Sequence, residues 1–507
     1  MNRRGFIQIS SVALIPILLG VFPKGRKVNY TVKVNSNRKF GHLMRQHIDT
    51  APTTFQKKDI VIVGAGIAGI AAGAHLQDFD IQIFEADNKM GGSSSSSDYK
   101  SARFANGAHY ELAYPTNFGD DVISFLKKLE VIEFNSQSQL YEFKEKKFVI
   151  SKTAIEQAYQ NKNIEESVLG NSESVVKFEE ILKEFEGKMH LPTRLIDKEY
   201  QYLNEISFTD FLTSKMELSA DFKRRISYQM LDDWGGSIDQ VSALAGVHYY
   251  TCRPYNEKEI ELFSAPHGNN YFIQKMLNSF TNYDCIETEA LVKSIRIEDD
   301  QVITEVIHPN GTVSQTTSKQ LIYAGQKHAL KYIVKDSEHL FQNEYSPWVT
   351  LNFVCRKGIQ FDKWQNDILS EDLAFLGFVN SQEQHTRGDL DVFTVYFCFE
   401  SGDRKKLIDF EEKPQTIIDA SIKLISQHTG EDLSNFIEHV NINILGHAMA
   451  IPKPKYLTFE NASNIDNKIF FAGADTGRLP LFFEACDSGI QAAKQIKNNL
   501  ENSTNES

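Results

Sequence analysis

The chain of 507 residues contains few of the residues that stabilise small disulfide-rich, metal-binding or fibrous proteins. It contains only five cysteines, none in a CxxC pair or in a cluster with histidine at zinc-ligand spacing. A disulfide framework and a metal site are therefore not expected. With 13 prolines and 29 glycines the chain is neither collagen-like nor low in complexity. At roughly 100–200 residues per domain, the length predicts two or three domains.

Positive charge is also scarce, with 54 basic against 67 acidic residues and a net charge of −13. No basic cluster follows the first few residues, which disfavours proteins that bind nucleic-acid backbones. An acidic chain suits a cationic small molecule slightly better than an anionic one. The composition therefore leaves an enzyme or a binding protein that acts on a small molecule.

The N-terminus has the form of an export signal. Arg3-Arg4 is followed by Gly-Phe-Ile-Gln and by a moderately apolar run over residues 9–22, which resembles the bacterial twin-arginine signal. The run is short for a membrane span and is interrupted by two serines and a proline; a buried helix is another interpretation. No A-x-A cleavage site follows, so residues 5–22 are a candidate membrane tether. We expect the twin-arginine translocation machinery as a partner, a periplasmic or secreted location, and a linker or mature N-terminal arm over residues 26–57.

A dinucleotide-binding motif begins after this segment. The β-branched run 59–63 predicts a buried parallel strand, and Gly64-x-Gly66-x-x-Gly69 then opens a helix of small residues. Gly64 allows a tight turn, Gly66 lets a diphosphate approach the backbone, and Gly69 lets helix and strand pack closely. The helix N-terminus offers N–H groups to the phosphates. A second strand ends in Glu85, at the spacing of a carboxylate that binds the adenosine ribose.

The next residues favour a flavin over a nicotinamide. Gly91-Gly92 follows Glu85 by six positions and resembles the second glycine pair of FAD enzymes in the flavin amine oxidase and protoporphyrinogen oxidase superfamily. That family usually has arginine next, whereas this chain has Ser93. The run Phe104–Tyr110 resembles a family segment near the flavin.

The C-terminal part resembles the closing FAD motif of the same family. A short apolar strand ends in Gly473-Ala474-Asp475, and a helix with small residues on one face begins near Phe482. The resemblance implies that the segment around Gly473 contacts the ribityl and phosphate region and that the helix directs its N-terminus at the flavin. The family has glutamate after the glycine, so Asp475 is the candidate for that contact. Between the two ends, the backbone at Val292 corresponds to the family's adenine contact.

The resemblance implies an α/β fold in which a Rossmann-like FAD-binding domain is built from three segments and interleaved with an α+β substrate domain. We expect helices in the first insertion and strands in the second. The predicted bounds are 58–135, 240–330 and 440–497 for the FAD-binding domain, 136–239 and 331–439 for the substrate domain, and 498–507 for a polar tail.

The resemblance also implies candidates for catalysis. Phe482 stands about where one aromatic of the family's substrate sandwich would lie, and His447 lies near the flavin or the substrate entrance. His109 and His267 are weaker candidates of the same kind. The family often has a lysine that holds a water near flavin N5; Lys327 and Lys331 are the nearest matches, and we expect both to be surface residues.

The sequence thus predicts an exported FAD-dependent oxidoreductase that takes a hydride from a C–N bond, with an amine as the favoured substrate. A flavin desaturase or dehydrogenase acting on C–C bonds is the nearest alternative. A flavoprotein without activity that serves as a binding partner is the other. An open cavity facing the flavin would favour catalysis, whereas a cavity filled by side chains would favour the binding protein.

Overall fold

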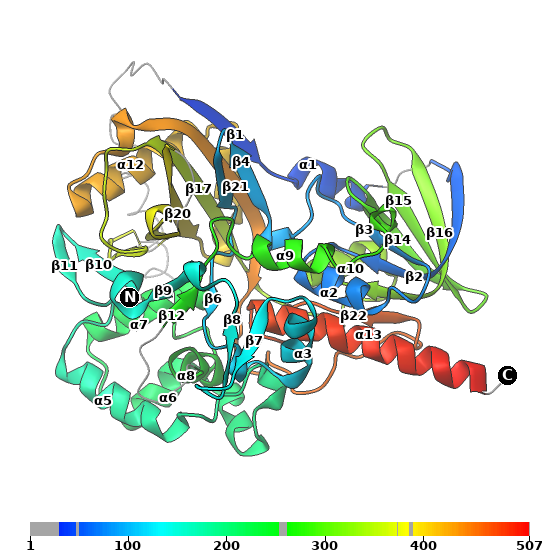
Figure 1. The fold of residues 1–507 in the computed structure, drawn as a ribbon, viewed down its shortest axis with the longest axis horizontal. Helices are drawn as coiled ribbons and strands as arrows, with labels where there is room; N and C mark the ends of the chain where they lie inside the picture. Colours follow the sequence, from blue (N-terminus) through cyan, green and yellow to red (C-terminus); the bar gives the residue numbers. More distant parts are fainter. Residues whose placement is uncertain (1–29, 47–49, 253–260, 373, 385–388, 506–507) are drawn as a thin grey trace, which may run out of the picture.

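The computed structural model describes residues 30–46, 50–252, 261–372, 374–384 and 389–505. Two large sheets lie side by side, each with its own helices (Figure 1). The predicted signal and tether, residues 1–25, lie outside the described residues. Within the described part, no helix combines the length and the apolar character needed to cross a membrane.

The first sheet belongs to the nucleotide-binding domain. Its strand order is β13-β3-β2-β16-β15-β14, with β22 beside β16. The strands β13, β3, β2, β16 and β22 pair in parallel with one another, whereas β15 is antiparallel to β16 and forms the predicted antiparallel hairpin with β14. The bounds are β2 Thr54–Val63, β3 Ile81–Phe84, β13 Ile286–Glu287, β14 Leu291–Glu298, β15 Gln301–Ile307, β16 Val313–Tyr323 and β22 Ile469–Phe471. Residues 60–63 are buried, as expected for a parallel strand covered on both faces.

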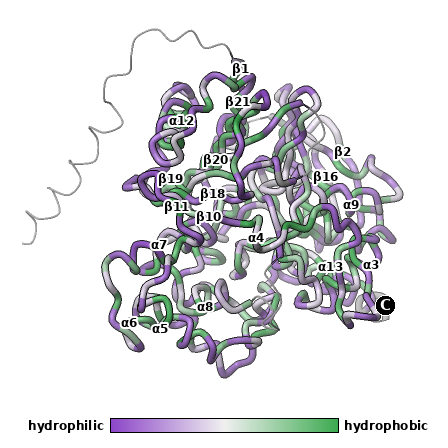
Figure 2. Tube along the Cα trace, turned by 60° about the vertical axis from the view of Figure 1, so that its left-hand side comes forward, coloured by the Kyte–Doolittle hydropathy of each residue, from purple (hydrophilic) through white to green (hydrophobic). Residues whose placement is uncertain are grey.

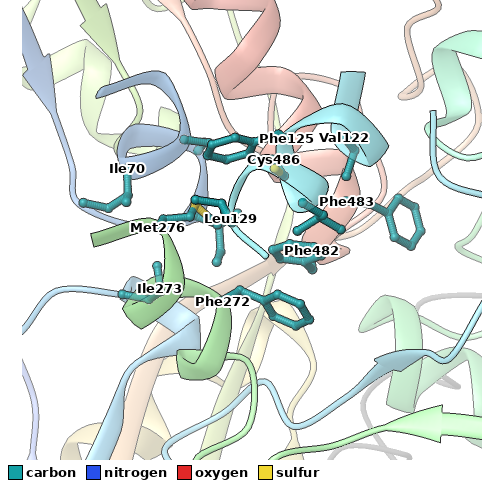
Figure 3. Close-up of a cluster of buried hydrophobic side chains, with 14 of the residues drawn as sticks. Ile70, Val122, Phe125, Leu129, Phe272, Ile273, Met276, Phe482, Phe483 and Cys486 are labelled. Atoms are coloured by element: carbon teal, nitrogen blue, oxygen red, sulfur yellow. The ribbon is translucent and has the colours of Figure 1, made fainter. Parts of the chain in front are cut away.

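Four helices meet on one side of this sheet in a single hydrophobic cluster (Figure 3). They are α2 Ile67–His75, α3 Asp120–Lys128, α9 Asn270–Leu277 and α13 Phe482–Asn505. The helices α2 and α13 approach closely, since a Cβ on Gly489 would stand 2.2 Å from the carbonyl oxygen of Ala68. The predicted tail is therefore the end of helix α13, which continues to Asn505.

The second sheet forms the core of the second domain. Its order is β1-β21-β17-β20-β19-β18-β10-β11, mostly antiparallel, with parallel pairs at β1–β21 and β10–β18. The bounds are β1 Thr31–Asn35, β10 Glu156–Gln160, β11 Asn163–Glu165, β17 Tyr345–Arg356, β18 Gln365–Ile368, β19 Phe375–Asn380, β20 Leu390–Cys398 and β21 Ile437–Ala450. The helices α11 Lys406–Glu412 and α12 Gln415–Thr429 pack against it.

A group of helices with its own hydrophobic cluster completes the second domain (Figure 2). It comprises α5 Glu173–Leu182, α6 Phe208–Lys215, α7 Ala220–Trp234 and α8 Ala243–Thr251. Ser207, Ser219 and Ser242 cap the last three, each accepting a hydrogen bond from a first-turn backbone N–H. The smaller elements are α1 Arg38–Gly41, α4 Lys152–Ile155, α10 Leu330–Ile333, β4 Ser96–Tyr99, β5 Ala102–Ala105, β6 Glu111–Leu112, β7 Ile132–Asn135, β8 Leu140–Phe143, β9 Val149–Ser151 and β12 Glu261–Phe263.

The structure places two boundaries differently from the sequence prediction. Strand β21 remains in the second sheet as far as Ala450, although residues from 440 were assigned to the nucleotide-binding domain. Helix α8, within the segment 240–330, packs in the helical cluster of the second domain. The segment 26–57 is also not a plain linker: its described part contains β1, α1 and the short 3-10 helix His42–Arg45, and it ends in β2.

Candidate functional site

A cavity of about 1490 Å³ runs between the two domains. This exceeds the roughly 300–1,000 Å³ of ordinary small-molecule pockets. Of the predicted cofactor-binding residues and the two leading catalytic candidates, Phe482 and His447, all but one line it: Gly64, Gly66, Glu85, Gly91, Gly92, Val292, His447, Gly473, Asp475 and Phe482. The exception is Gly69. The cavity brings together residues more than 400 positions apart; the role assigned to each residue remains a prediction.

The three glycines after β2 are used in different ways. Gly64 has a φ of +101°, which favours glycine. A Cβ on Gly69 would lie 1.9 Å from the Gly64 carbonyl oxygen, so this glycine serves the packing of α2. A Cβ on Gly66 would meet no protein atom within 4 Å and would project into open space. This opening beside the N-terminus of α2 is where a diphosphate would fit, so the observed backbone suits a dinucleotide.

The second glycine pair completes this cradle. The Gly91 N–H donates to the Ala65 carbonyl at 2.8 Å, and Gly66 and Gly91 form a parallel bridge. A Cβ on Gly92 would stand 3.6 Å from the Gly66 Cα. The serines that follow are ordered by Asn106, whose N–H donates to the Ser95 carbonyl at 3.0 Å. Two backbone segments therefore meet where the resembled enzymes pass their chain beside the cofactor.

Glu85 lies at the end of β3 and lines the cavity. Its carboxylate accepts hydrogen bonds from the Ala65 N–H at 2.7 Å and from the Asp87 N–H at 2.8 Å. Burial raises the pKa of Glu85, while the two backbone donors oppose that rise. The carboxylate is thus held at the carboxyl end of the strand, where a ribose would lie in a Rossmann-like domain.

Asp475 is the centre of a buried polar network. Its carboxylate accepts from the Lys327 N–H at 2.8 Å, from the Lys327 ammonium at 3.1 Å and from the Tyr345 hydroxyl at 2.8 Å. The Lys327 ammonium also donates to the carbonyls of Gly325 and Ala472, at 2.9 and 2.6 Å. The expectation that Lys327 lies on the surface is wrong, since the residue is 2% exposed and burial lowers its pKa. Lys331 is exposed as expected.

His447 lies at the cavity wall, stacked on His328 with ring centroids 3.6 Å apart. Burial, followed by the charge of the neighbouring His328, lowers the pKa of His447 to about 3. Burial likewise lowers the pKa of His328 to about 4. Both imidazoles are therefore neutral near pH 7 and can serve as flat walls or as hydrogen-bonding groups, but not as cations.

Phe482 begins helix α13 and stacks on Phe272, with centroids 4.1 Å apart (Figure 3). It is 4% exposed and belongs to the cluster where α2, α3, α9 and α13 meet. One face of its ring is therefore used for packing. The buried Glu111 accepts from the Phe482 N–H and from the Asn269 amide, the latter at 2.8 Å. Burial raises the pKa of Glu111 to about 8. No local pattern in the sequence indicates this carboxyl at the helix N-terminus.

Aspartates of the second domain form an acidic side of the cavity. Asp232 and Asp233 come from the end of α7, and Asp367 from β18. Burial raises the pKa of Asp367 to about 8 and that of Asp232 well above its ordinary value, with the neighbouring carboxylates adding to both shifts. Asp367 accepts from the Tyr228 hydroxyl at 3.2 Å and from the Gln365 amide at 3.0 Å, both through Oδ1.

Aromatic side chains border this acidic side. Tyr110, Trp348 and Tyr396 line the same cavity, and Tyr396 hydrogen-bonds His109. Burial lowers the pKa of His109 to about 4. Trp234 also lines the cavity, and its indole N–H donates to the Ala245 carbonyl at 3.1 Å. The side chain therefore both stabilises the helical cluster and forms part of the cavity wall. His267 is not among the lining residues. Sequence analysis did not identify Asp232 and Asp233, the two aspartates beside Trp234, as site residues.

Residues 62–129 match the family model of a NAD(P)-binding Rossmann-like domain. No protein in the curated collection matches the sequence at a significant level.

Solved structures match most of the chain. A putrescine oxidase double mutant with redesigned cofactor binding has a TM-score of 0.62 at 13% identity, over 88% of this chain and 100% of that one. A protein from Exiguobacterium sp. 255-15 assigned as a protoporphyrinogen oxidase has 0.61 at 13% identity, over 88% and 99%. Cyclohexylamine oxidase from Brevibacterium oxydans IH-35A has 0.60 at 13% identity, over 88% and 99%. The chain therefore has the fold of these enzymes, a Rossmann-like dinucleotide-binding domain interleaved with a second α+β domain.

Proposed function

We propose that the protein is an FAD-dependent oxidoreductase that oxidises the C–N bond of an amine. The carrying observation is one cavity that joins the glycine cradle at α2 to an acidic, aromatic pocket of the second domain. A space of this size favours catalysis over an inactive binding protein, because side chains do not fill it. The solved amine oxidases of the same fold support the choice of substrate.

The cofactor fits the residues present. Gly64, Gly66, Gly91 and Gly92 would lie along its diphosphate, Glu85 at the adenosine ribose, and the Gly473–Asp475 turn at the ribityl end. When bound, the flavin accepts a hydride at N5 and passes the electrons to O2 or another acceptor.

The acidic side of the cavity suits a cationic substrate. Asp232, Asp233 and Asp367 repel one another when ionised, so an ammonium group that enters among them relieves this repulsion. Because the pKa of Asp367 is about 8, its carboxyl is mostly protonated at pH 7, and the fraction that ionises as the pH approaches 8 can take the ammonium proton and leave the amine neutral. Tyr110 and Tyr396 provide flat surfaces that exclude water from the substrate. A carotenoid-like hydrocarbon would gain nothing from these carboxyls, so the C–C desaturase becomes the second candidate.

The surroundings of Lys327 bear on the identity of the electron acceptor that reoxidises the flavin. Lys327 does not line the cavity, and its ammonium is occupied by two carbonyls and Asp475. It therefore does not serve as a lysine that holds a water near N5. We propose that an acceptor other than O2 competes for the reduced flavin.

Anaerobic mixing of the purified protein with a panel of mono- and diamines and amino acids tests the proposal. Bleaching of the flavin absorbance by an amine supports it, and peroxide on admission of air identifies O2 as an acceptor. Bleaching by none of them would overturn the amine assignment. With a bleaching amine in hand, Asp367→Asn should raise KM at least about tenfold at pH 8 and above, where the wild-type carboxylate is ionised and can pair with the ammonium. The surface variant Asp239→Asn is the matched control, since Asp239 pairs with Lys223 outside the cavity.

We also propose export by the twin-arginine route, which carries folded proteins and so allows FAD to be loaded before transport. The double substitution Arg3→Lys with Arg4→Lys should retain the protein in the cytoplasm, as measured by cell fractionation. Unchanged export would overturn this proposal.

A further inference from the structure

The segment of residues 30–46, which we name the N-terminal arm, connects the two domains. Its strand β1 is added in parallel to the edge of β21, with Thr31 opposite His439 and Asn35 opposite Asn443. The chain then passes through α1 and the 3-10 helix His42–Arg45 towards the nucleotide-binding domain (Figure 1). The arm precedes the first strand of the dinucleotide motif, yet it begins on the sheet of the other domain.

Polar contacts fasten the start of the arm. The Asn35 amide donates to the side-chain oxygens of Asn441 and Asn443, at 2.8 and 2.9 Å. These two asparagines belong to a buried amide network that includes Asn352 and Asn106. Further along, the Arg38 guanidinium pairs with Glu411 of helix α11 at 2.7 Å. Ordering a chain segment costs conformational entropy, so contacts of this kind are needed to hold it in place.

The end of the arm reaches the part of the cavity assigned to the adenosine. Met44 packs against the hydrophobic cluster that contains Val292 and Tyr323, and the Arg45 guanidinium lies 5.0 Å from the ring centroid of Tyr332. The 3-10 helix of the arm contacts strand β14, on which Val292 lies. Ser36, Arg38, Gly41, His42 and Met44 line the same cavity as Glu85 and Gly66. The arm is therefore a wall of the cavity.

The arm also brings positive charge to this wall. Lys33 and Lys89 both line the cavity, and Lys89 stands two residues before Gly91-Gly92. Desolvation, followed by the charge of Lys33, lowers the pKa of Lys89. Among the described residues, neither ammonium has a carboxylate within ion-pair distance; Lys89 instead donates to the Ser96 carbonyl and the Ser97 hydroxyl, at 3.1 and 2.8 Å. Two ammonium groups that face a cavity without a carboxylate partner suit an anion such as a diphosphate. Ser93, where the resembled family has arginine, leaves this charge to be supplied from elsewhere.

We propose that the N-terminal arm is the outer wall of the cofactor site and retains FAD, with Arg38–Glu411 as its fastening and Lys33 as an added contact for the diphosphate. The inference rests on the flavin part of the proposed function. It is independent of the substrate.

The test measures the release of FAD from the full-length holoprotein. Arg38→Ala and Glu411→Ala each remove the same ion pair, so each should speed FAD dissociation about tenfold. Because both variants lose the same interaction, the double variant should release FAD no faster than either single variant. Lys33→Ala should weaken FAD binding about fivefold at low salt and less at high salt. Lys39→Ala is the matched control, because Lys39 is an exposed arm residue outside the cavity wall, and it should leave release unchanged.

A second measurement uses the unaltered protein and avoids any effect of a variant on folding. Trypsin should cut after Lys39 and Arg45 at least about tenfold more slowly when FAD is bound, because cutting requires the arm to open locally. Cleavage after the distant Lys215 serves as the control and should not change. Wild-type release rates in both fastening variants, or equal trypsin cleavage of the arm with and without FAD, would overturn the inference while leaving the proposed function intact. A wild-type protein that binds no FAD would overturn both.

Discussion

Gly66 and Gly69 are three residues apart in one motif, yet alanine at each position should have a different effect. Gly66→Ala places a methyl group in open space at a backbone with a φ of −79°, which alanine tolerates. Gly69→Ala places its methyl 1.9 Å from the Gly64 carbonyl oxygen. The first change therefore affects a bound ligand, and the second affects the protein itself.

The magnitudes follow from the surroundings of helix α2. To accept the Gly69 methyl, the helix must move about 1 Å, but it is clamped between the sheet and α13; such overpacking costs roughly 3 kcal/mol, and better helix propensity returns about 1 kcal/mol. The melting midpoint of the apoprotein should fall by about 4–8 °C. Gly66→Ala should leave it unchanged or raise it slightly, since alanine restricts the unfolded chain.

For FAD binding the order is reversed, and Gly66→Ala should have the larger direct effect. A methyl group on Gly66 displaces the diphosphate from the backbone donors at the start of α2, and losing one hydrogen bond to a charged group costs about 1.5–3 kcal/mol, or roughly a 10- to 150-fold loss of FAD affinity. FAD per protein after desalting gives the retention, and differential scanning fluorimetry of the apoproteins gives the melting midpoint. A Gly66→Ala variant that retains FAD like the wild type, or whose apoprotein melts as low as Gly69→Ala, would refute this account of the cradle.

Three further changes probe the buried groups. Lys327→Met leaves the Asp475 carboxylate without its cation and should cost about 3–5 kcal/mol; the double variant with Asp475→Asn should melt higher than the single one, and an equal melting temperature would contradict the pair. Because the pKa of Asp367 is raised to about 8 from an unfolded value near 3.9, the folded state binds the extra proton between these values, and the contribution of Asp367 to apoprotein stability falls as pH rises from 4 to 8. Asp367→Asn should remove this pH-dependent loss of stability, so the melting midpoint of the variant relative to wild type should rise from pH 5 to pH 9. A difference in melting midpoint that stays constant over this range would argue against the raised pKa. Gly489→Ala sets a methyl 2.2 Å from the Ala68 carbonyl and should lower the melting midpoint and FAD retention together, whereas normal values for both would show that the helices can separate.

The parts of the site that sequence analysis predicted depend on local patterns. Gly64, Gly66 and Gly69 have roles that only a residue without a side chain can fill, so their spacing is readable in a single segment. Glu85 follows a short apolar strand at a fixed distance from them. The closing segment 473–493 is equally local, because a strand must end and a helix must begin where the cofactor lies. The structure brings all of these together at α2, β3 and α13.

The parts that were missed depend on contacts between distant residues. Lys327 looked like a surface lysine because nothing near it in the chain shows that Asp475 and two carbonyls receive its charge. Asp232 and Asp367 lie 135 positions apart, on a helix and a strand that only the tertiary fold brings to one cavity. Sequence analysis predicted the arm only as a linker or N-terminal extension and did not predict where it would pack. The five residues of β1 lie in a polar segment and show too little periodicity to predict a strand.

The pairing of β1 with β21 has a consequence for the order in which the protein is assembled. Thr31 and His439, which face each other in this pair, are 408 positions apart. During synthesis the arm emerges before both domains, but its partner strand is made only near the end, so the two can pair only after most of the chain exists. If the arm is the outer wall of the cofactor site as proposed above, this order leaves the groove between the domains open to a dinucleotide until β1 pairs with β21. The proposed wall of the cofactor site would thus be the part of that site that is completed last.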